Sequence, residues 1–168
     1  ILTLSFQSLI YADDIRDFEI EGISIGDNLL KHISKKQIID AKKNSRLIYL
    51  DKFIAFKIPV KIKDKDLYDR IIVTLKQGSD LTIFHVSASK DLTNNFNKFN
   101  EKRKIISNEV SNLFSNANKV EAPNRKHSAD KSGKSITSST YFWIGKNFVE
   151  VSCYDMDQDN PKNWIDEL

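Results

Sequence analysis

Three side chains in the C-terminal part of the sequence could together form a hydrolase site. Cys153 would act as the nucleophile, His127 as the general base and Asp130 as the residue that orients the histidine. Such a thiol needs a lowered pKa, and no sharp turn or helix N-terminus that would supply it is visible around Cys153. In the run FVEVSCYD, Val149, Val151 and Cys153 alternate with Glu, Ser and Tyr, which predicts a strand that turns the thiol toward a core. The residue is therefore either a core thiol or a nucleophile.

A second group with possible chemistry is the acidic segment DMDQDNPKNWIDE. Asp155, Asp157 and Asp159 stand at the first, third and fifth positions of a calcium-binding loop, and Asp166 stands at the twelfth. Asn160 replaces the usual glycine, and strands rather than helices are expected around the segment. It is thus either a solvated acidic turn or a Ca²⁺ site. The sequence indicates no other cofactor.

Residues 1–12 carry no charge, are mostly apolar and are followed by Asp13 and Asp14. This pattern is typical of the apolar region and cleavage end of a secretory signal peptide. A transmembrane helix would need about 20 apolar residues, so the run is too short to span a membrane. We predict a signal peptide remnant over 1–12 and a mature protein in the periplasm or outside the cell. The alternative is a buried first strand.

The composition of the 168 residues is that of a globular protein, with 40% hydrophobic and 29% charged residues and a net charge of +3. The lysines are scattered rather than clustered, which argues against a nucleic-acid partner. We expect residues 13–168 to form a single domain, truncated at its C-terminus because apolar residues continue to the end of the sequence. An unknown protein or a small ligand of the cell envelope is the expected partner.

The apolar periodicity predicts an alternation of helices and antiparallel strands. We expect a pair of short helices after an N-cap at Asp27, with a capping box from Ser34 to Gln37 and Ile38 and Ile39 turned inward. Three strands within 53–88, a helix over 94–117, a loop over 118–140 and a hairpin over 140–155 follow in that order.

The helix predicted over 94–117 is amphipathic and long. Its apolar stripe comprises Phe96, Phe99, Ile106, Val110, Leu113 and Ala117, with Ile105 and Phe114 beside it. Such a stripe is expected to cover one side of a sheet. The predicted fold class is α+β, an antiparallel sheet with helices packed on one face.

The stretches DFEIEGISIGDNLL, HSADKSGKS, VSCYDM and NWIDEL resemble a group of uncharacterised exported proteins from AT-rich free-living marine bacteria. This resemblance implies export but supplies no catalytic residues. The helix pair after GISIGD and the strands that follow are also similar to the small outer-membrane assembly lipoproteins of the SmpA/OmlA type and to the β-lactamase-inhibitor-protein fold. No cysteine stands just after the apolar segment, which departs from the lipoprotein pattern.

These observations predict an exported, non-catalytic binding or interaction module of the cell envelope. Two alternatives stay open. One is a small secreted thiol hydrolase that uses Cys153 and His127. The other is a calcium-binding domain that uses residues 155–166.

Overall fold

The computed structural model of the chain describes residues 14–44, 48–50, 52–63, 65, 67–78, 80–90, 96–128 and 130–157. The predicted signal peptide remnant over 1–12 lies outside these residues, as do Asp159 and Asp166. The elements in chain order are η1 (Ile15–Asp17), η2 (Leu29–Lys31), α1 (Lys35–Asn44), β1 (Ile48–Leu50), β2 (Phe53–Ile58), β3 (Arg70–Lys76), β4 (Ile83–Ser89), α2 (Phe96–Leu113), β5 (Asn118–Lys126), β6 (Ile136–Ile144) and β7 (Asn147–Asp155).

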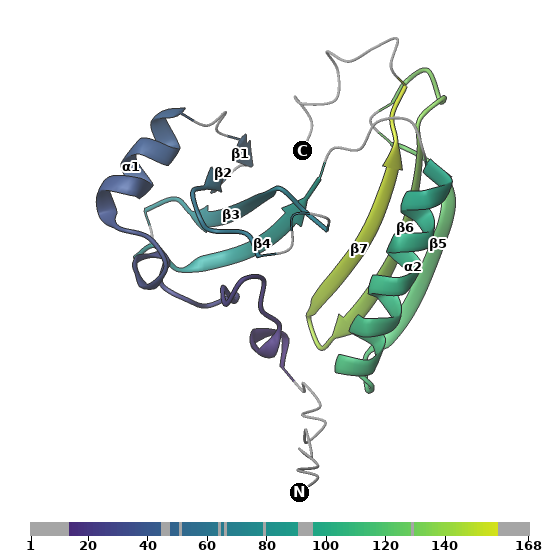
Figure 1. The fold of residues 1–168 in the computed structure, drawn as a ribbon, viewed down its shortest axis with the longest axis horizontal. Coiled ribbons are helices and arrows are strands. Elements are labelled where there is room, and N and C mark those ends of the chain that lie inside the picture. The colour runs from purple at the N-terminus through teal and green to yellow at the C-terminus, as the bar shows by residue number, and fades with distance from the viewer. Residues whose placement is uncertain are drawn as a thin grey trace, which may run out of the picture. The chain divides into compact units, whose positions relative to one another are not determined.

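The predicted α+β class with antiparallel sheets is confirmed (Figure 1). The chain divides into two compact units. The N-terminal unit consists of the described residues 16–90, and the C-terminal unit of residues 14, 15 and 96–157. In each unit one α-helix precedes the antiparallel strands against which it packs.

The N-terminal unit is an antiparallel sheet in the order β1-β2-β3-β4, with α1 packed against β2 (Figure 1). Its core joins Leu29, Ile33 and Ile38 to side chains from one face of β2, β3 and β4, because alternate strand residues point to the same side. The predicted capping box is confirmed: the Gln37 side chain accepts from the Ser34 amide at 2.9 Å. Ile39 is exposed, so the prediction that it points inward is wrong.

The C-terminal unit is an antiparallel sheet in the order β5-β6-β7 with α2 packed along β6 and β7 (Figure 1). The sequence predicted a loop over 118–140, but most of this segment is β5 and the first half of β6. The error has a physical cause. β5 lies at the edge of its sheet, and Ala122 is its only buried residue. Because the other residues of β5 are exposed on both faces, the strand shows no alternation of apolar and polar residues.

The buried side of α2 differs in part from the predicted stripe. Val110 and Phe114 are buried as core residues, and Phe114 follows the last helical residue. Ile106 and Leu113 are only partly buried, whereas the neighbouring Ile105 is 59% exposed. Arg103 and Ser107 share the buried side of the helix with the apolar residues.

Replacing Phe114 with alanine should lower the free energy of unfolding of the C-terminal unit by about 3 to 5 kcal/mol, because a cavity remains where the ring was. The matched control is Ile105→Ala, which trims an exposed side chain and should change the stability by less than about 0.5 kcal/mol. Urea unfolding followed by circular dichroism measures both. Equal losses for the two variants would contradict the assignment of Phe114 to the core.

Candidate binding surface

Cys153 lies on β7 and is buried, 7% exposed. It is opposite Ser138 of β6, on the same face as the pair formed by Thr140 and Val151. This is the face on which α2 packs, since the Arg103 guanidinium of α2 donates a hydrogen bond to the Thr140 hydroxyl.

Burial raises the pKa of the Cys153 thiol, Arg103 opposes this effect and Asp155 adds to it. The thiol is therefore held in its protonated form, which is a poor nucleophile.

The structure places His127 on the other side of this sheet. The His127 ring packs edge-on against the Tyr154 ring, with the centroids 5.7 Å apart. Tyr154 and Cys153 are consecutive strand residues, so their side chains leave β7 on opposite faces. The sheet thus separates the predicted base from the predicted nucleophile.

Asp130 organises the connection between β5 and β6. Its carboxylate accepts hydrogen bonds from the Ser132 amide at 2.8 Å and from the Ser135 amide at 2.7 Å. Burial opposes the charge, but the hydrogen bonds donated by Ser132 and Ser135 outweigh it and lower the pKa of this carboxyl. Both carboxylate oxygens of Asp130 therefore hold this turn in shape.

The acidic segment is described as far as residue 157. Asp155 is the exposed last residue of β7. The Asp157 carboxylate is 3.7 Å from the Lys134 ammonium and accepts from the Ser132 hydroxyl at 3.4 Å, and its amide donates to the Ser135 hydroxyl. Among the residues described by the structure, no three His, Cys, Asp or Glu side chains gather in a group that could hold a metal ion. The calcium hypothesis also needs Asp159 and Asp166, which are outside them.

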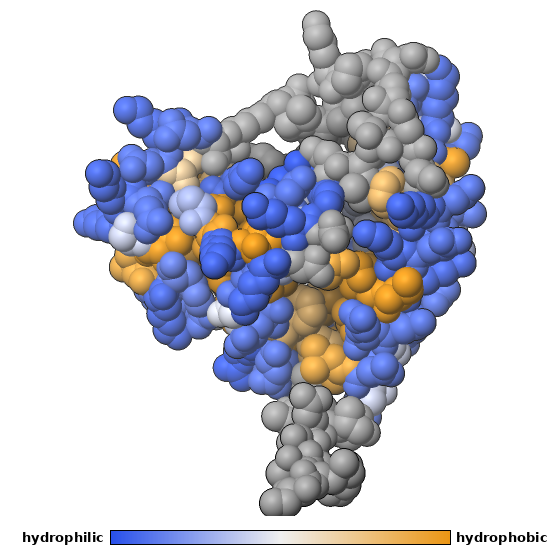
Figure 2. Space-filling view, in the orientation of Figure 1, coloured by the Kyte–Doolittle hydropathy of each residue, from blue (hydrophilic) through white to orange (hydrophobic). Residues whose placement is uncertain are grey.

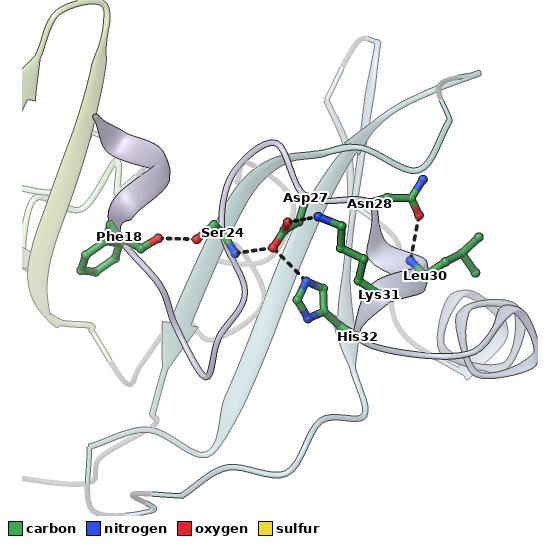
Figure 3. Close-up of polar contacts among 7 residues, drawn as sticks. All are labelled: Phe18, Ser24, Asp27, Asn28, Leu30, Lys31 and His32. Carbon is green, nitrogen blue, oxygen red and sulfur yellow. Dashed lines mark hydrogen bonds and ion pairs between the residues drawn. The ribbon is translucent and has the colours of Figure 1, made fainter. Parts of the chain in front are cut away.

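The N-terminal unit has a polar cluster centred on Asp27 (Figure 3). The Asp27 carboxylate accepts from the Ser24 amide at 3.2 Å, pairs with the Lys31 ammonium at 2.9 Å and lies 2.9 Å from His32 Nε2. The hydrogen bond from Lys31 is the largest influence on the pKa of Asp27. Together with the bonds from Ser24 and His32, it outweighs the opposing effect of burial and lowers the pKa to about 2.

An aspartate beside a histidine is found in many hydrolases, but the serine that the structure describes at this pair, Ser24, does not direct its hydroxyl to the histidine. The Ser24 hydroxyl donates to the Phe18 carbonyl at 3.0 Å (Figure 3). The cluster shapes the loop that pairs with the start of β4, where the Ile83 amide donates to the Asp27 carbonyl. Asp27 is not the N-cap that the sequence predicted, because the neighbouring Asn28 caps η2 through the Leu30 amide.

The Asp27 cluster should make the N-terminal unit sensitive to acid. A carboxyl with a lowered folded-state pKa stabilises the fold above its unfolded pKa of about 3.9, and this contribution is lost as the pH falls toward the folded value. We expect the free energy of unfolding of the wild type to decrease as the pH is lowered from 4 toward the Asp27 pKa of about 2. In Asp27→Asn this decrease should be smaller.

Urea midpoints measured at several pH values give the slope for each variant. Asp40→Asn, which removes an exposed carboxylate from α1, is the control for the change in net charge. If Asp27→Asn and the wild type lose stability in parallel, the hydrogen bonds to Asp27 do not favour the folded state.

The face of the β5–β6–β7 sheet opposite α2 carries exposed aromatic side chains. Trp143 of β6 is 42% exposed, and Phe148 and Tyr154 of β7 are 45% and 49% exposed. The Trp143 and Phe148 rings are 5.0 Å apart between centroids, and Tyr141 meets Phe148 at 5.9 Å. Figure 2 shows hydrophobic residues among hydrophilic ones on the side of the molecule turned to the viewer, and α2 lies in front of β6 in this orientation (Figure 1), so the face opposite α2 points away from the viewer. We call the outward residues of β6 and β7 the outer face.

The inward residues of the final hairpin could be predicted from the alternation of Val149, Val151 and Cys153, whereas the outer face was not predicted. The signal was present in TYFWIGKNFVEVSCYD, because large apolar or aromatic residues occur at both alternate sets of positions. A strand pair with one solvated face normally shows polar residues on that face. In this hairpin, large aromatic residues occur on both faces, and those on the outer face are exposed.

Comparisons with protein-family models, with curated proteins and with solved structures found no match to this chain. Within the part of the chain that the structure describes, no helix has the length and apolar content needed to cross a membrane.

Proposed function

We propose that this chain is a non-catalytic binding module of the cell envelope, exported to the periplasm or beyond, and that the outer face is its contact surface. The observation that carries the proposal is the exposure of Trp143, Phe148 and Tyr154 on one face of a sheet. Large aromatic side chains contribute most to binding when they are exposed before and buried after association. The resemblance to exported proteins supports the location.

The position of the thiol also favours a binding module over a thiol hydrolase. Cys153 faces α2, while His127 lies beside Tyr154 on the opposite side of the sheet. A nucleophile and its base must lie within hydrogen-bonding reach. The arrangement therefore gives no support to acid–base activation of this thiol.

The test is co-sedimentation of the purified protein with an envelope fraction, made of outer membranes and cell-wall sacculi from a Gram-negative bacterium. We expect the wild type to sediment with the fraction and Trp143→Ala/Phe148→Ala to stay in the supernatant. Ile39→Ala, which trims an exposed side chain of the N-terminal unit, should behave like the wild type. Cys153→Ser should also bind, because the proposal assigns the thiol no role.

Thermal midpoints within a few degrees of the wild type confirm that each variant is folded. Equal sedimentation of the wild type and the double variant would contradict the proposal, as would loss of binding in Cys153→Ser with an unchanged midpoint.

A further inference from the structure

The edges of the two sheets differ in how well they are protected against pairing with another strand. An edge strand presents unpaired N–H and C=O groups, and proteins normally keep it short, interrupt it or cover it. Among the described residues, the edge strands are β1, β4, β5 and β7 (Figure 1). Three of these are short, covered or interrupted, and β7 is none of these.

The protection of β1, β4 and β5 takes a different form in each strand. β1 is only three residues long. The start of β4 is covered, because the Gly26 amide donates to the Ile83 carbonyl and the Ile83 amide donates to the Asp27 carbonyl. β5 contains Pro123, which has no N–H, and a register shift interrupts its pairing with β6. Each of these edges is therefore a poor template for another strand.

The strand β7 is long and uninterrupted. It pairs with β6 along its 9 residues without a register shift, and it contains no proline. Gly145 and Lys146 form the two-residue turn of this hairpin, and such a turn joins the Asn147 amide to the Ile144 carbonyl. Bonds to β6 then alternate along β7, so the N–H and C=O groups of its even-numbered residues point away from β6.

The sequence of β7 is complementary to itself when two copies pair antiparallel over their whole length. A two-fold axis then passes beside Val151, the middle residue of the strand. On the outer face, Phe148 of one copy stands opposite Tyr154 of the other, and Glu150 stands opposite Ser152. Two aromatic rings, or a carboxylate and a hydroxyl, are favourable cross-strand neighbours.

Neighbouring registers are less favourable. Moving the axis by one residue toward the hairpin turn would place Glu150 of the two copies directly opposite each other, and like charges in that position are destabilising. Moving it the other way would place Phe148 opposite Met156, which lies past the end of β7, and would shorten the paired stretch. Strand overlap and charge therefore favour the same register, in which the two Glu150 carboxylates lie diagonally and each stands opposite a serine.

One flank of α2 lies on the β7 side of the unit. Lys119 lowers the pKa of the Glu121 carboxyl of β5 most, and Lys104 of α2 adds to this effect. Lys104 therefore stands on the flank of the helix that faces β5. Ile106 is about 200° from Lys104 around the helix, so it stands on the opposite flank, which faces β7.

This β7-side flank of α2 is apolar. It carries three partly buried residues, Phe99, Ile106 and Leu113. Arg103, one turn before Ile106, donates to Thr140, and Thr140 pairs with Val151. Ile106 consequently lies near the level of the two-fold axis, where the same flank of a second copy would cover it.

We infer that the chain forms a symmetric dimer in which two copies of β7 pair antiparallel about an axis beside Val151 and the apolar flanks of α2 meet across it. The occupant of the edge is a second copy because the strand register, the charges and the helix flank all complement themselves. Pairing joins two three-stranded sheets into one continuous sheet and leaves the outer face open. The dimer goes beyond the proposed function and does not depend on it.

Sedimentation-velocity ultracentrifugation over a range of protein concentrations tests the dimer. We expect the wild type to dimerise and Ser152→Glu to raise the dissociation constant about tenfold, because each new carboxylate stands opposite Glu150 of the other copy. Ser152→Lys should not weaken the dimer, because its ammonium stands opposite the same carboxylate. The control is Val120→Glu, at an exposed position of β5, which should dimerise like the wild type.

Disulfide trapping tests the register separately. In a Cys153→Ser background, Val151→Cys places two thiols in a non-hydrogen-bonded pair across the axis, with about 4.5 Å between Cα atoms, which is within disulfide reach. Val149→Cys in the same background places the two Cα atoms about 14 Å apart. On mild oxidation, only the Val151→Cys variant should run as a covalent dimer on a non-reducing gel.

Four results would overturn the inference. They are a wild type that is monomeric at every concentration, equal dissociation constants for Ser152→Glu and Ser152→Lys, dissociation by Val120→Glu as strong as by Ser152→Glu, and cross-linking of Val149→Cys in preference to Val151→Cys. A monomeric wild type would leave the edge of β7 to a strand of a different protein. A dimer that does not sediment with the envelope fraction would sink the proposed function and leave this inference standing.

Discussion

The packing of α2 against one face of the β5–β6–β7 sheet is the constraint on which the C-terminal unit depends. Val110 and Phe114 are buried there, and the inward residues of β6 and β7 face the helix. Among the described residues of this unit, α2 is the single α-helix, and a helix covers one face of a sheet. The position of α2 therefore decides which face each strand residue belongs to. Cys153 lies on the face that α2 covers, and Trp143 and Tyr154 lie on the outer face.

Arg103 fixes how α2 lies on the sheet. This arginine is 5% exposed, and its guanidinium donates to the Thr140 hydroxyl of β6 and to the Asn100 side chain one helical turn earlier. A buried charge is costly unless it is hydrogen-bonded, so a helix shifted by one turn along the sheet would lose the bond to Thr140, whereas the bond to Asn100 lies within the helix. The pairing with Thr140 thereby selects one register of helix on sheet, which apolar contacts alone would specify less sharply.

The residues with strong periodicity could be predicted from the sequence. The alternation of Val149, Val151 and Cys153 predicted an inward thiol, which is buried. The strand β5 could not be predicted, because an edge strand with only Ala122 buried is held by backbone pairing with β6. The Cys153, His127 and Asp130 grouping came from residue types alone, and the side of the sheet on which each residue lies depends on register.

Hydroxyl-radical footprinting read by mass spectrometry measures whether the two faces of this sheet differ in exposure. We predict fast oxidation of Trp143, Phe148 and Tyr154 in the native protein and protection of Phe114 and Phe142, which are 2% and 1% exposed. Unfolding in urea should abolish the difference. Comparable oxidation of both groups in the native state, or protection of Trp143 and Tyr154, would contradict the assignment of these aromatic residues to an exposed face.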